Sequence, residues 1–199
     1  MDSVESAPLL CAGITTFNAL RHCGAGPGDV VAVHGVGGLG HLAIQFAARQ
    51  GFRTVAIARG RDKEQLARSL GAHEYIDSER SDPAAALQAL GGATAIIATV
   101  TSAEAMQAIV GGLGVNGTMM VIGAVGALTV NSLELLGKRA AVKGWYSGTA
   151  VDSEDTLRFS QRNQVTSTNE IYPLDQAQTA YERMMSGKAR FRVVLKVGD

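Results

Sequence analysis

The sequence predicts an α/β fold: a doubly wound six-stranded parallel sheet, with a short helical linker before it and a C-terminal return segment after it. Three observations predict this class. Apolar runs typical of buried strands alternate with segments of helical periodicity between residues 30 and 145. A glycine-rich turn joins the first such strand to the helix that follows it. The strict alternation stops after about residue 147, which marks the return segment.

The predicted elements follow from the spacing of apolar residues and from the glycines and prolines that interrupt it. An apolar segment at residues 9–23 is expected to be helical and to end at the glycine- and proline-rich residues 24–28. Because strands that alternate with helices form a parallel sheet covered on both faces, a ligand is expected at the carboxyl ends of the strands. The strands are expected at residues 30–34, 53–58, 73–77, 94–98, 117–122 and 141–145, and the helices between them at 38–50, 61–70, 83–90, 102–112 and 131–138.

A different pattern begins in the return segment. Residues 152–162 predict a polar helix, and residues 164–169 predict a loop. Residues 173–187 contain a helix with one apolar face, and residues 190–197 alternate between apolar and polar side chains as a strand does. The return segment is therefore expected to hold two helices and one strand.

The glycine-rich turn is the most specific motif of the chain. Gly35, Gly37 and Gly40 have the G-x-G-x-x-G spacing of dinucleotide-binding βαβ units. The first glycine is expected to permit the tight turn, the second to leave room for a pyrophosphate, and the third to let the helix pack closely on the strand. The free backbone N–H groups of Gly38 and Leu39 are expected to bind the phosphates. The alternative is a structural βαβ turn without a ligand.

Composition narrows the classes of partner. The 18 Lys and Arg residues balance the 18 Asp and Glu residues, so no excess of positive charge indicates a nucleic-acid partner. No apolar run is long enough to span a membrane, and the N-terminus lacks the pattern of a signal peptide. The two cysteines, Cys11 and Cys23, do not make a disulfide framework, which favours a reducing, cytoplasmic location.

Three segments resemble one family, in the same order along the chain. Residues Ala7–Phe17 resemble the segment that joins the two domains of zinc-dependent medium-chain alcohol dehydrogenases, and the turn at 36–40 follows at the spacing usual there. Residues Gly187–Leu195 resemble the closing strand of these enzymes. The resemblance implies an interdomain helix at 1–27, a dinucleotide-binding Rossmann domain at 28–147, and a helix-and-strand tail of the catalytic domain at 148–199. The N-terminal catalytic domain of the family is expected to be absent, so that the chain is a C-terminal fragment.

The resemblance makes Cys11 one of the zinc ligands of the family. A catalytic zinc needs three protein ligands and an open position. The four histidines of the chain show no ligand spacing with Cys11, so we expect no tightly held zinc here, although the full-length parent would bind one. Without a metal, Cys11 is an ordinary thiol of an apolar helix. No complete set of catalytic residues is expected within this chain.

The end of the second strand discriminates NADP from NAD. A carboxylate there would bind the adenosine ribose and repel a 2′-phosphate, but the chain has Ala58. Arg59 and Arg61 follow, and arginine binds phosphate through a planar, bidentate fork. We therefore expect NADP, with NAD as the alternative if these arginines are only solvated loop charges and the cofactor is unselective. The resemblance adds Lys63 as a contact to the adenosine ribose.

The resemblance implies five further contacts to the cofactor. Thr15 corresponds to a threonine that touches the nicotinamide, and a helix hydroxyl bonded to its own backbone is the alternative. Ile122 and Gly123 match backbone positions beside the nicotinamide, and Val100 is expected to cover the adenosine side. Arg192 matches an arginine that reaches the pyrophosphate, with a charge at a strand edge as the alternative.

These features predict the cofactor-binding portion of an enzyme that transfers hydride between a small alcohol or aldehyde and NADP(H), with zinc as Lewis acid in the parent. Little activity is expected from this chain alone, and His41 is interpreted as solvated or packed rather than catalytic. One alternative is a cofactor-binding regulatory or interaction module. Another is a zinc-independent quinone or enoyl reductase of the same superfamily, which would need no thiolate at Cys11. Family dimers pair their sixth strands, so a homodimer through residues 141–145 is expected.

Overall fold

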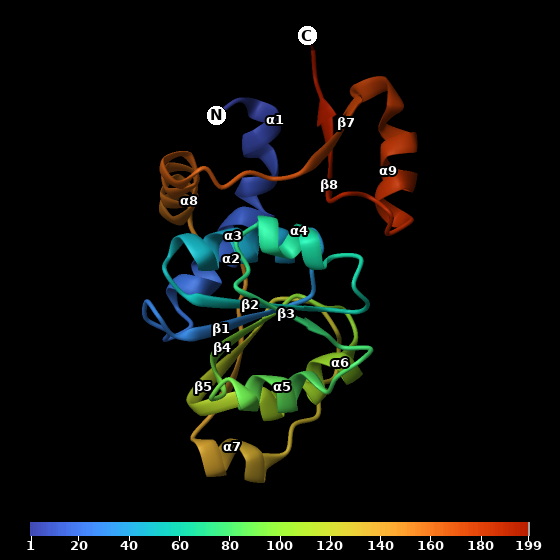
Figure 1. The fold of residues 1–199 in the computed structure, drawn as a ribbon. Helices are drawn as coiled ribbons and strands as arrows, with labels where there is room; N and C mark the ends of the chain where they lie inside the picture. The colour runs from blue at the N-terminus through green and yellow to red at the C-terminus, as the bar shows by residue number, and fades with distance from the viewer. Residues whose placement is uncertain (199) are drawn as a thin grey trace.

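The computed structural model describes residues 1–198 and contains the predicted parallel sheet (Figure 1). Its strand order is β3-β2-β1-β4-β5-β6, and neighbouring strands all pair in parallel. The order reverses between β1 and β4, which creates the crevice where open α/β sheets bind ligands. The strands are β1 (Val30–His34), β2 (Arg53–Ala58), β3 (Glu74–Asp77), β4 (Ala93–Ala98), β5 (Leu113–Val121) and β6 (Ala141–Gly144).

Helices cover both faces of the sheet, as predicted (Figure 1). On one side lie α2 (Ala12–Arg21), α3 (Gly40–Arg49) and α4 (Glu64–Ser69); on the other lie α5 (Pro83–Ala89), α6 (Ala103–Ala108), the 3-10 turn η2 (Val110–Gly112) and α7 (Ser132–Lys138). Phe17 and Phe46 pack in the first core with ring centroids 5.2 Å apart, and Leu87 and Met106 are fully buried in the second. Within residues 1–198 no helix is both long and apolar enough to cross a membrane.

The predicted helix at residues 9–23 is interrupted near its start. The chain begins with the short helix α1 (Ser3–Ser6) and the 3-10 turn η1 (Ala7–Leu10), and α2 begins only after Cys11. Cys11 has φ −130° and ψ −75°, outside the helical region, and its N–H donates to the Pro8 carbonyl at 3.4 Å. The prediction of one continuous helix is therefore wrong, because the backbone tightens into a 3-10 turn and then breaks.

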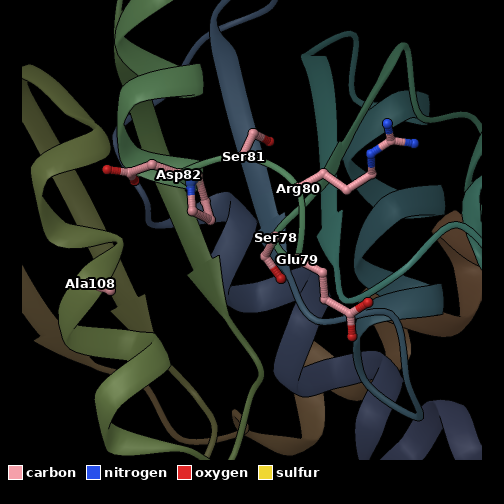
Figure 2. Close-up of a pocket in the computed structure, with 7 residues that line it drawn as sticks. Ser78, Glu79, Arg80, Ser81, Asp82 and Ala108 are labelled. Carbon is pink, nitrogen blue, oxygen red and sulfur yellow. The ribbon is translucent and has the colours of Figure 1, made fainter.

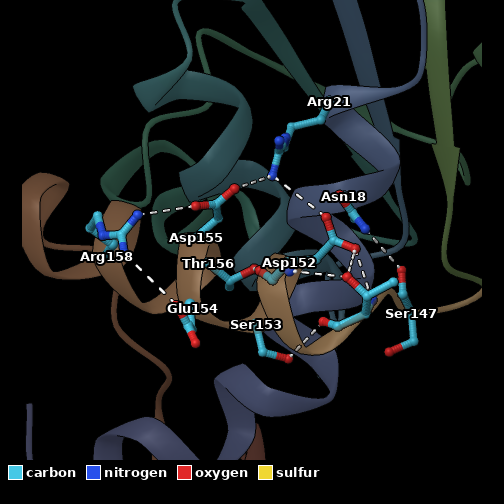
Figure 3. Close-up of polar contacts among 10 residues, drawn as sticks. Asn18, Arg21, Ser147, Asp152, Ser153, Glu154, Asp155, Thr156 and Arg158 are labelled. Carbon is cyan, nitrogen blue, oxygen red and sulfur yellow. Dashed lines mark hydrogen bonds and ion pairs between the residues drawn. The ribbon is translucent and has the colours of Figure 1, made fainter.

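Polar contacts fix the first helix of the tail, α8 (Ala150–Asn163), against α2 (Figure 3). Arg21 Nη1 lies 3.1 Å from Asp155 Oδ2 and 3.8 Å from Asp152 Oδ1. Asn18 Nδ2 donates to the Ser147 carbonyl at 3.3 Å, just before α8 begins. α2 and the start of the tail are thus joined to each other.

The rest of the tail contains a strand that the sequence does not reveal. β7 (Asn169–Pro173) pairs in parallel with β8 (Arg192–Lys196), and η3 (Leu174–Gln176) and α9 (Ala177–Met185) connect them. The prediction of a loop at 164–169 followed by a helix misses β7, since the strand begins with polar residues and ends in proline. Glu170 of β7 accepts hydrogen bonds from the Arg183 guanidinium at 2.7 and 2.9 Å and from the Arg190 N–H at 2.8 Å, and these bonds lower the pKa of Glu170 to about 2.

Candidate functional site

The turn after β1 has the backbone geometry that its three glycines predict. Gly35 has φ +105°, and a Cβ there would lie 2.6 Å from Thr99 Oγ1. A Cβ on Gly40 would overlap the carbonyl oxygen of Gly35, so α3 begins this close to β1 only because residue 40 is glycine. A Cβ on Gly37 would meet no atom of residues 1–198 within 4 Å. The first and third glycines therefore serve the fold, whereas the space above the second is open.

The start of α3 presents backbone N–H groups beside this open space. The N–H groups of Gly38 and Leu39 donate no hydrogen bond within residues 1–198. The His41 N–H donates to the Gly37 carbonyl at 3.0 Å, which is the first hydrogen bond of the helical turn. Because unpaired N–H groups at a helix start carry the positive end of the helix dipole, this corner is suited to bind an anion.

Val100, Ile122 and Gly123 lie together beyond the ends of β4 and β5. Ile122 and Gly123 both donate their N–H groups to the Ala98 carbonyl, at 3.1 and 3.0 Å. A Cβ on Gly123 would overlap the carbonyl oxygen of Val100. The N–H and the hydroxyl of Thr99 both donate to the last carbonyl of β1, at 3.0 and 2.9 Å. The structure thus places these three predicted residues at the carboxyl ends of the strands, where the glycine turn also lies.

The loop after β2 is held in place by β3. Ala58, at the end of β2, pairs with Asp77 of β3. Asp77 Oδ1 accepts hydrogen bonds from the N–H groups of Gly60, at 2.8 Å, and Glu79, at 3.0 Å. Tyr75 Oη donates to the Gly60 carbonyl at 2.6 Å. Both polar groups of the Gly60 backbone are therefore fixed, and so is the backbone from which the arginines on either side project.

Positive side chains gather around this loop. Arg59 and Arg61 are exposed, and Lys63 is half-buried at the start of α4. Burial lowers the pKa of Lys63, and the positive charges of Arg190 and Arg59 lower it further. None of the ion pairs within residues 1–198 involves these four side chains. Sequence reasoning missed Arg190, because only the folded tail brings it to this loop.

Arg192 lies beside the glycine turn. It begins β8, and a Cβ on Gly38 would lie 2.9 Å from its Nη1. The guanidinium therefore adds a positive charge near the N–H groups of Gly38 and Leu39 at the start of α3. His41, in the first turn of α3, is fully buried, and its ring stacks on Phe191 with centroids 4.7 Å apart. Of the two interpretations that the sequence left open for His41, solvated or packed, the structure shows the packed one.

Cys11 and Thr15 lie one helical turn apart. Thr15 Oγ1 donates to the Cys11 carbonyl at 2.7 Å, as the alternative interpretation of this hydroxyl expects. The Cys11 thiol is exposed, and the residue precedes α2, which corrects the expectation of a thiol within an apolar helix. The His, Cys, Asp and Glu side chains of residues 1–198 form no cluster of three that could hold a metal ion. These residues alone therefore do not fit a catalytic zinc, which needs three protein ligands.

A surface hollow of about 470 Å³ lies beside the end of β3, lined mostly by the loop that follows this strand. Its side chains do not converge, since Arg80 and Glu79 extend to one side and Asp82 to the other (Figure 2). Asp82 Oδ1 accepts the Ala84 N–H at 2.9 Å and so caps α5. None of the site residues that the sequence predicts lines this hollow. The site residues that the sequence predicts lie instead at the glycine turn, at the adjacent ends of the strands and at the loop after β2.

Comparison with known proteins gives one consistent result. Residues 38–162 match the family model of zinc-binding dehydrogenases. Over 195 residues the chain is 46% identical to the alcohol dehydrogenase patD of Penicillium expansum and 47% identical to the alcohol dehydrogenase notN of an Aspergillus species. Each alignment covers 98% of this chain but only 57% and 58% of the two relatives. The chain thus spans little more than half the length of these enzymes.

Solved structures share the fold. The alcohol dehydrogenase of the archaeon Aeropyrum pernix matches with a TM-score of 0.87 and 29% identity, over 96% of this chain and 57% of that protein. The Helicobacter pylori protein CAD, in a complex with NADP(H), matches with a TM-score of 0.80 and 27% identity, over 95% of this chain and 54% of that protein. The sheet and the elements before and after it therefore have a similar arrangement in these proteins.

Proposed function

Because this chain belongs to the family of zinc-binding dehydrogenases, we propose that it is the part of an alcohol dehydrogenase that binds a nicotinamide dinucleotide. The observation that carries the proposal is the open space above Gly37, next to the N–H groups of Gly38 and Leu39, which donate no hydrogen bond within residues 1–198, and to the Arg192 guanidinium, which lies against Gly38. A pyrophosphate in this space would accept hydrogen bonds from the backbone N–H groups. The positive end of the α3 dipole would stabilise its charge, and so would the Arg192 guanidinium, which can bind a phosphate through two hydrogen bonds.

The three parts of the chain have separate roles in this proposal. Residues 1–27 form the interdomain helix, residues 28–147 form the dinucleotide-binding domain, and residues 148–199 are the helix-and-strand tail of the catalytic domain. Val100 covers the adenosine side of the cofactor. Thr15 and the backbone at Ile122 and Gly123 face its nicotinamide.

The cofactor is proposed to be NADP(H), with its 2′-phosphate at the loop after β2. Ala58 offers no carboxylate there, and Asp77, which pairs with it, has Oδ1 bonded to two backbone N–H groups. Arg59, Arg61 and Lys63 supply positive charge with no carboxylate partner among residues 1–198. The NADP(H) complex of the Helicobacter pylori neighbour supports the same choice.

The proposed reaction is hydride transfer between a small alcohol or aldehyde and the nicotinamide. A bound zinc would supply Lewis-acid chemistry at the substrate oxygen, with Cys11 as one of its ligands. The remaining zinc ligands are proposed to lie in the part of an alcohol dehydrogenase that corresponds to the portion of the longer relatives not spanned by this chain. We therefore expect this chain alone to bind cofactor but to turn over little alcohol.

Calorimetric titration of the chain with NADPH and with NADH tests the cofactor proposal. We expect NADPH to bind about tenfold or more tightly, because charge-assisted hydrogen bonds to a 2′-phosphate contribute about 1.5–3 kcal/mol. The double variant Arg59→Ala/Arg61→Ala should lose this preference and keep its affinity for NADH. Arg80→Ala, in the exposed loop after β3, is the matched control and should change neither affinity. Tighter binding of NADH by the wild type contradicts the 2′-phosphate site, and binding of neither nucleotide contradicts the cofactor proposal.

The free edge of β6 is proposed to pair with β6 of a second copy. β6 is the last strand of the sheet, and Tyr146, just beyond it, is 93% exposed. An unpaired strand edge is prone to such pairing. Sedimentation velocity is expected to give the mass of two chains, and Tyr146→Glu should shift the population towards one chain through charge repulsion at the interface. Tyr181→Glu, on the exposed face of α9, is the control that should leave the dimer intact, and a monomeric wild type would contradict the pairing.

A further inference from the structure

We propose that His41 is a positioning residue that aligns Arg192 with the glycine turn, and so sets how tightly the chain holds the pyrophosphate of a dinucleotide. The inference rests on the proposed function, because it takes the corner above Gly37 as the place of the pyrophosphate. It gives a role to a buried histidine that lies next to the proposed pyrophosphate position and takes no part in the hydride transfer.

The hydrogen bonds of His41 fix both of its ring nitrogens. Its Nδ1 lies 3.0 Å from the Gly37 carbonyl, and its Nε2 lies 3.2 Å from the Thr168 nitrogen. The Thr168 N–H can only donate, so Nε2 must be the unprotonated nitrogen and Nδ1 must carry the hydrogen. The ring is therefore held neutral, in one tautomer, between the glycine turn and the segment that precedes β7.

That segment in turn holds the strand that carries Arg192. The Thr168 carbonyl accepts hydrogen bonds from the N–H groups of both Phe191 and Arg192, at 2.9 and 3.0 Å. The Phe191 ring stacks on the His41 ring with centroids 4.7 Å apart and an interplanar angle of 24°. His41 thus contacts the start of β8 twice, once through Thr168 and once through the Phe191 ring.

Gln45, one turn further along α3, supports the same connection. Its Nε2 donates to the Thr166 carbonyl at 2.9 Å, and its Oε1 accepts the Thr166 N–H at 3.2 Å. Two neighbouring turns of α3 therefore bind residues 166–168 through side chains that are nearly inaccessible to solvent. The backbone that presents Thr168 to His41 is accordingly well fixed.

These contacts form a closed series that begins and ends at the glycine turn. They run from the Gly37 carbonyl through His41 and Thr168 to Arg192, whose guanidinium returns to Gly38. A shift of the His41 ring would therefore move Arg192 relative to the N–H groups that face the open space. Because of this closed series of contacts, His41 positions Arg192 in addition to packing in the core between α3 and the tail.

A double-variant cycle tests the inference with NADPH as the probe. His41→Asn keeps a donor near the Gly37 carbonyl but is too short to accept the Thr168 N–H. We expect His41→Asn to weaken NADPH binding about tenfold, and Arg192→Ala to weaken it at least as much. In the Arg192→Ala background, His41→Asn should cause no further loss, because the residue it positions is gone. An equal loss in both backgrounds would show that His41 acts on the turn alone and would overturn the inference.

Adenosine 2′-phosphate, which has no pyrophosphate, separates alignment of Arg192 from general damage to the fold. Its affinity should be unchanged by His41→Asn, whereas an equal loss for both probes would overturn the inference. A wild type that binds neither NADPH nor NADH contradicts the proposed function itself, while a wild type that binds NADPH and tolerates His41→Asn within about twofold contradicts only the role of His41.

Nitrogen-15 spectra of the histidine rings in the wild type keep the inference testable if His41→Asn does not fold. We expect His41 to show a protonated Nδ1 and an unprotonated Nε2, and its signals to shift when NADPH binds but not when adenosine 2′-phosphate binds. The opposite tautomer, or the absence of a shift with NADPH, would overturn the inference.

Discussion

Gly40→Ala is expected to destabilise the fold severely, whereas Gly37→Ala is expected to leave the fold intact and to remove cofactor binding. A methyl group on residue 40 would overlap the carbonyl oxygen of Gly35, and neither backbone can move without separating α3 from β1. Overpacking against side chains usually costs about 1–3 kcal/mol, so a collision between two backbones should cost about 3 kcal/mol or more. That is a large share of the stability of a typical domain.

Gly37→Ala changes the same motif by the same methyl group. A Cβ on residue 37 meets no atom of residues 1–198 within 4 Å, so the free energy of unfolding should change by less than about 1 kcal/mol. The added methyl would instead occupy the space proposed for the pyrophosphate. We therefore expect the loss of most NADPH affinity without a loss of stability.

Urea unfolding and calorimetric titration of both variants separate the two roles. Gly40→Ala should shift the unfolding midpoint far below that of the wild type, and Gly37→Ala should keep the midpoint but bind NADPH at least about tenfold more weakly. The description of the turn would be wrong if Gly40→Ala were as stable as the wild type. The proposed pyrophosphate position would be wrong if Gly37→Ala bound NADPH normally.

The fold is expected to lose stability steeply between pH 6.5 and pH 4 because of two buried histidines. Burial lowers the pKa of His34 and of His41 from 6.5 to about 4. His34 Nδ1 is buried without a hydrogen-bond partner within residues 1–198, and protonation of His41 would break its bond with the Thr168 N–H. Both side chains are therefore neutral in the folded protein throughout most of this range.

The sign of the effect follows from proton binding in the two states. Between pH 6.5 and pH 4 these histidines are protonated in the unfolded chain but not in the folded one, so the free energy of unfolding falls as the pH falls. Above pH 6.5 both states are neutral and the contribution is fully present. Each shift corresponds to about 3 kcal/mol at the acid end of the range, and the two together approach the total stability of a typical domain.

Urea unfolding at several pH values measures this proton uptake directly. Near pH 5 the slope of the free energy of unfolding against pH should contain close to two protons from these side chains, and His34→Leu should remove about one of them. Leucine is a suitable replacement because it fills the site without a polar atom to leave unpaired. A slope that His34→Leu leaves unchanged would show that His34 is protonated in the folded protein.

Local sequence features were enough to predict most of the sheet and the glycine turn. β1 and β2 have the predicted bounds, because each contains four consecutive apolar residues and has glycine nearby on both sides. The packing role of Gly40 depends on Gly35, only five positions earlier, whereas Gly35 also meets Thr99, which is distant in the sequence. The helix predicted at 102–112 ends at Ala108, and the chain passes through η2 into β5 four residues earlier than predicted.

The features that the sequence did not reveal depend on contacts between distant residues. β7 begins with two polar residues and ends in proline, so it has no apolar run, and it forms a strand by pairing with β8. Asp77 cannot be identified as the residue that holds the Gly60 backbone until β2 and β3 are paired. Arg190 and the closed series of contacts through His41 require the tail to return across the start of α3. Periodicity and spacing describe neighbours along the chain, and these contacts are not between such neighbours.

The position of Arg192 also bears on the order of events during synthesis. All six strands of the sheet end by residue 144, so they are synthesised before Thr168 and Arg192, which complete the corner above the glycine turn. Because domains begin to fold as they emerge, the sheet is expected to form before its proposed ligand corner is finished. Binding of a dinucleotide at this corner would then require residues 168–192 to have folded onto the start of α3.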